Sequence, residues 1–208
     1  MKSVIYVLGL FIAMTVTSAA ALASLYDCYY TSTVNLTAIG QSASTPYSVY
    51  FRYDTNATPE QILIGETGVG FARYWVDGSL TVGEHTITFS DGLMIVANDR
   101  SFLGGDAFAV TNLIPGTTLT GQIYGYTISS FYFELRDSDY QSIDSVAPPE
   151  GNTVLDNFDW NDNAMWLEGG PNIKTTDVAY TINAVLVPES ATVSLLAVGG
   201  LALLRKRK

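Results

Sequence analysis

The stretch "PYSVYFRYDT", residues 46–55, alternates between two kinds of side chain with a period of two. One set is large and apolar and the other is mostly polar: Tyr47, Val49, Phe51 and Tyr53 against Ser48, Tyr50, Arg52 and Asp54. Such alternation is typical of a β-strand with one buried and one solvated face. This stretch therefore predicts a half-buried strand.

Similar strand patterns follow through most of the chain. The further strands are predicted at 69–78, 79–92, 93–99, 106–112, 118–128, 130–137 and 177–186. Turn-forming pairs separate them: Asp77-Gly78, Asp91-Gly92, Asn98-Asp99 and Pro115-Gly116. Gly83 is expected to mark a bulge, and "TPEQILIG", residues 58–65, to form one short helical turn.

About ten short strands in one domain favour two packed antiparallel sheets, as in a β-sandwich or jelly roll. We place this single all-β domain at residues 24–186, with a loop at "DSVAPPEGNT", residues 144–153, because Pro148-Pro149 excludes regular pairing. The residues expected in its core are Phe51, Phe71, Phe89, Phe133 and Ile182, with Trp75 as a further core aromatic.

The N-terminus has the layout of a secretory signal peptide. Lys2 precedes an apolar stretch from Val4 to Val16, and small residues follow. Ala21 and Ala23 fit the cleavage rule, so residues 1–23 are predicted to be removed by signal peptidase. The alternative is an uncleaved anchor helix.

The C-terminus, residues 187–208, combines a short apolar run with a basic end. Residues 191–204 carry no charge, which is shorter than the roughly 17–25 residues of a spanning helix. Four basic residues follow and favour a cytoplasmic end: Arg205, Lys206, Arg207 and Lys208. These features indicate a short hydrophobic transmembrane helix that enters the inner membrane transiently. A weak permanent tail anchor is the alternative.

The net charge of the body differs from that of the two ends. The termini carry five of the ten basic residues and one of the twenty acidic ones, which leaves 5 basic against 19 acidic side chains and a net charge of −14. Nucleic acid and anionic lipid repel such a domain. Cys28 is the only cysteine, so the fold has no internal disulfide, and we expect no special role for this thiol.

The C-terminal segment resembles the PEP-CTERM sorting signal of exported bacterial proteins. The motif maps onto Val187, Pro188, Glu189 and Ser190, followed by Gly199-Gly200 in the apolar run and the basic "RKRK". Ser190 stands where the family has its second proline. Weaker similarity covers the body, in "FRYDTNATP", "FYFELRDS", "APP" and "LDNFDW".

The resemblance implies an exported substrate of an exosortase that becomes a cell-surface or extracellular-matrix component associated with exopolysaccharide. It implies an all-β body and names no chemistry for it.

Enzymatic activity is not expected. His85 is the only histidine, and no G-x-S-x-G nucleophile motif is present. Paired carboxylates could process glycosides, with Asp137 and Asp139 or Asp156 and Asp159 as candidates. Spacing in sequence does not place either pair across a cleft.

The stretch "LDNFDWNDN", residues 155–163, suggests two binding functions. Asp156, Asp159 and Asp162 offer oxygen ligands of the kind calcium takes, although acidic loops more often form turns. Trp160 and Trp166 flank these acids and could provide a platform for a sugar. Aromatic residues more often fill the interior of a sandwich.

Overall fold

The computed structural model describes residues 25–64, 70–100, 105–113, 117–139, 141–143, 145–151, 155 and 158–188. All pairs of neighbouring strands in these ranges are antiparallel, so the all-β antiparallel class is confirmed. The predicted signal peptide and apolar C-terminal helix lie outside them. No helix in the described part of the chain is long and apolar enough to cross a membrane.

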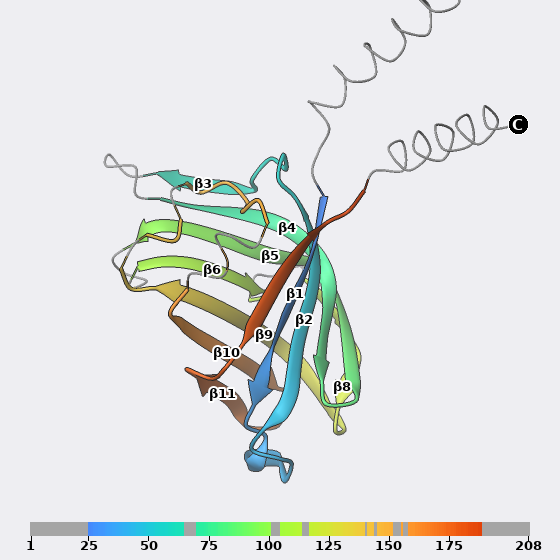
Figure 1. Ribbon diagram of the computed structural model, residues 1–208. Helices are drawn as coiled ribbons and strands as arrows, with labels where there is room; N and C mark the ends of the chain where they lie inside the picture. The colour runs from blue at the N-terminus through green and yellow to red at the C-terminus, as the bar shows by residue number, and fades with distance from the viewer. Residues whose placement is uncertain are drawn as a thin grey trace, which may run out of the picture.

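The strands form one curled sheet (Figure 1). Their bounds are β1 Leu25–Val34, β2 Thr45–Asp54, β3 Gln61–Ile64, β4 Gly70–Val82, β5 His85–Arg100, β6 Gly105–Thr111, β7 Thr118–Thr120, β8 Gln122–Ile123, β9 Tyr126–Asp137, β10 Trp160–Leu167, β11 Asn172–Thr176 and β12 Thr181–Leu186. A short 3₁₀ helix, Thr37–Ile39, follows β1. Hydrogen bonds connect the main path in the order β11-β10-β9-β6-β5-β4-β2-β1-β12. Two separate sheets are therefore not confirmed.

The curl arises because β4 and β5 change neighbours at their middles. The second half of β4 pairs with β2 and its first half with β3, while β5 pairs first with β7 and then with β6. The pairs Asp77-Gly78 and Asp91-Gly92 lie opposite each other at this point, inside long strands. The turns predicted at both pairs, and at Asn98-Asp99, are therefore wrong.

A bulge in β5 reverses which of its residues face inward. Val76 pairs with Gly92 and Gly78 with Phe89, so β5 has one residue more than β4 between these pairs. Asp91, which lies in this bulge, takes a left-handed conformation with φ 55°. As a result Phe89 before the bulge and Met94 after it are both buried.

Gly78 allows β2 and β4 to approach closely at the bend. A Cβ atom at this position would lie 2.6 Å from Cζ of Phe89, and still closer to the carbonyl oxygen of Tyr50. Any larger residue would push these strands apart.

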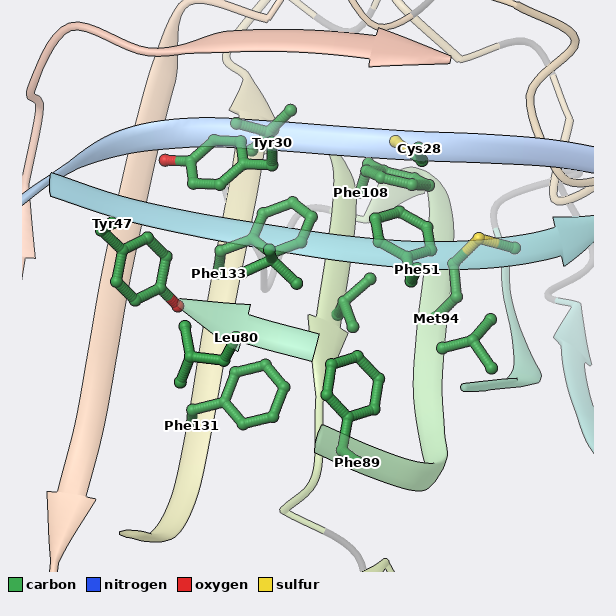
Figure 2. Close-up of a cluster of buried hydrophobic side chains, with 14 of the residues drawn as sticks. Cys28, Tyr30, Tyr47, Phe51, Leu80, Phe89, Met94, Phe108, Phe131 and Phe133 are labelled. Carbon is green, nitrogen blue, oxygen red and sulfur yellow. The ribbon is translucent and has the colours of Figure 1, made fainter. Parts of the chain in front are cut away.

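The core lies between the two halves of the curled sheet, and Figure 2 shows its aromatic centre. The ring of Phe51 in β2 lies 6.0 Å from the rings of both Phe108 in β6 and Phe133 in β9. The predicted burial of Phe51, Phe89, Phe133 and Ile182 is confirmed. The predicted inward face of residues 47–53 is also confirmed.

The predicted burial of Phe71 and Trp75 is wrong. On β4 the inward positions are Ala72, Tyr74 and Val76, so the odd-numbered residues face outward. Phe71 is half-buried and Trp75 is 48% exposed. Aromatic residues occur on both faces of this stretch, and the period-two pattern could not choose between them.

The predicted loop around Pro148-Pro149 lies outside the strands and covers one end of the core. Its carbonyl groups accept hydrogen bonds from two core tyrosines: Tyr53 donates to Pro149 at 2.9 Å and Tyr74 to Val146 at 2.8 Å. Both prolines are buried. This loop therefore belongs to the same core as the strands on either side of it.

Two local predictions need correction. Gly83 is the first residue of the two-residue turn between β4 and β5, with φ 61°, and is no bulge. Glycine suits this position because such hairpin turns require a positive φ there. The stretch Gln61–Ile64 is strand β3, not a helical turn.

Candidate functional site

The outer face of β9, β10 and β11 carries both tryptophans of the predicted sugar platform. Trp160 pairs with Arg136 and Trp166 with Ser130 across the β9–β10 ladder. The two positions are six apart along one strand, a distance of about 20 Å. The structure thus places Trp160 and Trp166 on one face, at opposite ends of β10.

Neighbouring side chains partly cover both indole rings. The guanidinium of Arg136 lies over the Trp160 ring, 4.7 Å from its centroid. The ring of Tyr132 lies 5.7 Å from that of Trp166. Both tryptophans are half-buried, so their rings pack against the protein as well as facing solvent.

Asp162 lies between these tryptophans and is 1% exposed. Its Oδ2 atom accepts a hydrogen bond from Tyr132 and lies 2.7 Å from Nζ of Lys174. Burial is the main cause that raises the pKa of the Tyr132 hydroxyl, and the hydrogen bond with Asp162 raises it further. The hydroxyl therefore stays protonated and donates. Asp162 therefore joins β9 and β11 on the outer face of the sheet.

The calcium candidates do not form one ligand set among the described residues. Asp159 accepts two hydrogen bonds from Ser138, through its amide and its hydroxyl. Asp162 is engaged by Tyr132 and Lys174 instead, and Asp156 lies outside the described residues. No group of three or more histidine, cysteine, aspartate or glutamate residues with metal-binding geometry occurs in the ranges that the structure describes.

Asn161 and Asn163 of the same stretch point inward and join the two ends of the sheet. Asn161 donates to Tyr30 at 3.0 Å and to the carbonyl of Val178 at 2.9 Å. Asn163 donates to Ser32 at 3.3 Å. These amides hold β1 against β10 from within the core.

Asp137, one of the carboxylates considered for glycoside chemistry, holds the loop that follows β9. Its oxygens accept the amide hydrogens of Asp139, Gln141 and Ser142 at 2.7–3.0 Å. Burial alone would raise the pKa of Asp137, but hydrogen bonds from Ser142 and from the Asp139 and Gln141 amides lower it to about 2. A hydrogen bond with Asp137, with a smaller effect of desolvation, raises the pKa of Asp139.

Asp106 of β6 lies opposite Asp137 and helps to hold the same loop. It accepts the amide hydrogens of Asp99 and Ile143, both at 2.8 Å. Burial is the main cause that raises its pKa. The two carboxylates thus fix the end of β5 and the loop after β9 by backbone hydrogen bonds.

His85 packs against a neighbouring ring, and Cys28 is buried in the core. The imidazole of His85 packs edge-on against Tyr124, with ring centroids 4.4 Å apart. Cys28 is fully buried in β1, and burial raises the pKa of its thiol.

Sequence reasoning missed a groove on the outer side of the bend. It has a volume of about 690 Å³, and its lining includes Tyr50 and Arg52 of β2, Trp75 and Asp77 of β4, and Asp91 of β5. The groove opens where β2 and β4 separate after the pair Arg52–Asp77. The two Asp-Gly pairs were the sequence signal for this groove. Their local pattern predicts turns, whereas in the structure they mark the bend.

The two ends of the described chain lie together. β1 pairs with β12 from Tyr26–Leu186 onward, and the amide of Val187 donates to the carbonyl of Leu25 at 2.8 Å. In Figure 1 the start of β1 and the end of β12 lie at the same corner of the sheet. Val187 and Pro188 of the sorting motif follow β12 without regular structure. Glu189, Ser190 and the basic residues 205–208 lie outside the described residues.

Comparison with known proteins gives no match to a family model, to a curated protein or to a solved structure.

Proposed function

We propose that this chain is an exported protein that is sorted through its C-terminal segment and functions, without catalysis, at the cell surface or in the extracellular matrix. The observation that carries the proposal is the pairing of β1 with β12, which brings Leu25 and Val187 together. Leu25, which follows the proposed leader, and Val187, which opens the proposed sorting motif, thus lie at one corner of the domain. That arrangement suits a body held by its tail on one side of a membrane.

Two processing enzymes are the partners that this proposal requires. Signal peptidase would cut after Ala23, and an exosortase would act at Val187, Pro188, Glu189 and Ser190. Pro188 disfavours helix at Val187, which favours an extended approach to a protease cleft. The apolar run after Glu189 is short for a span and would hold the tail in the inner membrane only until cleavage.

A non-catalytic role is supported by what the candidate catalytic groups do. Asp137 and Asp159 accept hydrogen bonds that fix the chain between β9 and β10, and His85 packs on Tyr124. These side chains have structural partners.

We also propose that the fold is a jelly-roll-like sandwich in which β4 and β5 belong to both layers. Strands that bend through a bulge commonly make such corners. The ring contacts of Phe51 with Phe108 and Phe133 support face-to-face packing of the layers.

A blot with two tags tests the sorting proposal in the native host. One tag is placed in the body and another after Lys208. Wild-type protein should lose the second tag, whereas Pro188→Ala combined with Glu189→Ala should keep both tags on one membrane-held species. Val185→Ala is the matched control because Val185 is 47% exposed and precedes the motif. Wild-type protein that keeps both tags would contradict the proposal and favour a permanent anchor.

A further inference from the structure

The groove at the bend owes its shape to the backbone. β2 follows β4 only as far as Arg52 and Asp77, and then continues toward Asp54 while β4 turns to pair with β3. Gly78 lines the groove, and a side chain at this position would collide with β2. The volume of about 690 Å³ is within the range of roughly 300–1,000 Å³ typical of ligand sites.

Trp75 presents an exposed indole on one side of this groove. It is the most exposed tryptophan of the three, at 48%, whereas Trp160 and Trp166 are half-buried. Its backbone partner on β5 is the fully buried Leu93, so these two side chains lie side by side on one face of the sheet. The ring is therefore accessible from the groove while its strand is held in the sheet.

The opposite side carries polar groups that are already fixed. Arg52 makes a two-pronged contact with Asp27, at 2.7 and 3.0 Å, and Tyr50 donates to the same carboxylate at 2.8 Å. Because these groups are ordered before any ligand arrives, binding would not have to immobilise them.

Between these sides the groove offers hydrogen-bonding groups at the bend. Asp77 accepts the amide hydrogen of Asp91 at 3.1 Å, which orients its carboxylate. The hydroxyls of Ser79, Thr88 and Ser90 also line the groove. Carboxylates and hydroxyls beside an indole match a ligand that has many hydroxyls and apolar C–H faces.

The charge of the groove selects between classes of glycan. Asp54, Asp77 and Asp91 line it, and the charge of Arg52 is already matched by Asp27. The surrounding body is strongly acidic as well. An anionic chain would be repelled, whereas an uncharged one would not.

We propose that this groove binds a neutral polysaccharide, with a sugar ring stacked on Trp75 and its hydroxyls bonded to Asp77 and Asp91. The partially positive C–H face of a pyranose complements the negative face of the indole. This inference deepens the proposed role at the cell surface or in the extracellular matrix and rests on it for its biological setting. It assigns the site to Trp75 rather than to Trp160 and Trp166.

The test is affinity gel electrophoresis of the full-length protein, purified in a non-ionic detergent. The probes are three neutral polysaccharides (a soluble β-glucan, a xylan and a mannan) and the anionic alginate. At least one neutral probe should retard the protein and alginate should not. Trp75→Ala should weaken binding at least about tenfold, and Trp75→Tyr should retain most of it because a ring remains.

Trp166→Ala is the matched control, since it removes an indole from the other end of the same outer surface and should change binding less than about twofold. Thermal melting of each variant checks that the fold is intact. Loss with Trp166→Ala but not with Trp75→Ala would overturn the assignment, as would binding to alginate alone or to no neutral probe. If no probe binds while the two-tag blot shows tail removal, the groove proposal fails and the sorting proposal stands.

Discussion

The ring of Tyr30 in β1 stacks on the ring of Phe133 in β9, with centroids 4.3 Å apart and planes 5° apart. The two strands come from opposite halves of the curled sheet, and both side chains are fully buried (Figure 2). This contact joins the halves at the centre of the core.

Phe133→Ala should lower the free energy of unfolding by about 3–5 kcal/mol, because it leaves a cavity between the two halves. Urea denaturation of the protein gives this value. Phe71→Ala is the control, since Phe71 is half-buried on the outer face and should cost clearly less. Equal losses for the two variants would show that the halves do not pack through Phe133.

Gly78→Ala should destabilise the protein by about 1–3 kcal/mol, because the added methyl group collides with the backbone of β2 and the ring of Phe89. The neighbouring Ser79→Ala should change stability by less than about 0.5 kcal/mol. Thermal unfolding followed by circular dichroism compares the two variants. A neutral effect of Gly78→Ala would mean that β2 and β4 are further apart at the bend than described.

The thiol of Cys28 should resist modification in the folded protein. It is fully buried and burial raises its pKa, so both access and thiolate formation are suppressed. A maleimide reagent at neutral pH should label it only after denaturant is added. Fast labelling without denaturant would place β1 outside the core.

Asp137 should contribute to stability above about pH 4 and lose this contribution as the pH falls toward 2. Its folded-state pKa of about 2 is below the usual value for aspartate, so the folded state favours the ionised form, by on the order of 2 kcal/mol. The raised pKa of Asp106 acts in the opposite direction, since protonation of Asp106 favours the folded state. The difference in unfolding free energy between wild type and Asp137→Asn isolates the first effect.

That difference, measured from pH 7 to pH 2, should shrink with decreasing pH. A difference that stays constant over this range would contradict the role of the Asp137 carboxylate as an anion held by backbone amides.

The sequence predicts the all-β class and the inward face of β2 well, because Tyr47, Val49, Phe51 and Tyr53 alternate without exception. It fails at the bend for a physical reason. Asp-Gly pairs favour turns locally, yet Asp77-Gly78 and Asp91-Gly92 face each other and are held within long strands by pairing with β2, β6 and β7. Long-range pairing of this kind has no local signal.

The candidate site was hard to predict for the same reason, because it depends on long-range contacts. Trp160 and Trp166 were recognisable from their place beside acidic residues, but Arg136 and Tyr132, which pack on them, come from β9. Trp75 is predicted from the sequence to lie in the core because aromatic residues usually fill the interior of a sandwich. In the structure Tyr74 points inward, so Trp75 points outward, where it lines the groove.

The decisive measurement is the intact mass of the mature protein recovered from the surface or matrix of its native host. Cleavage at both ends predicts a chain that begins at Ser24 and ends within or just before the Val187–Ser190 motif, with any attached lipid or glycan as added mass. A mass that includes the apolar run and Arg205–Lys208 would contradict removal of the tail. In that case the C-terminal segment would be a permanent anchor.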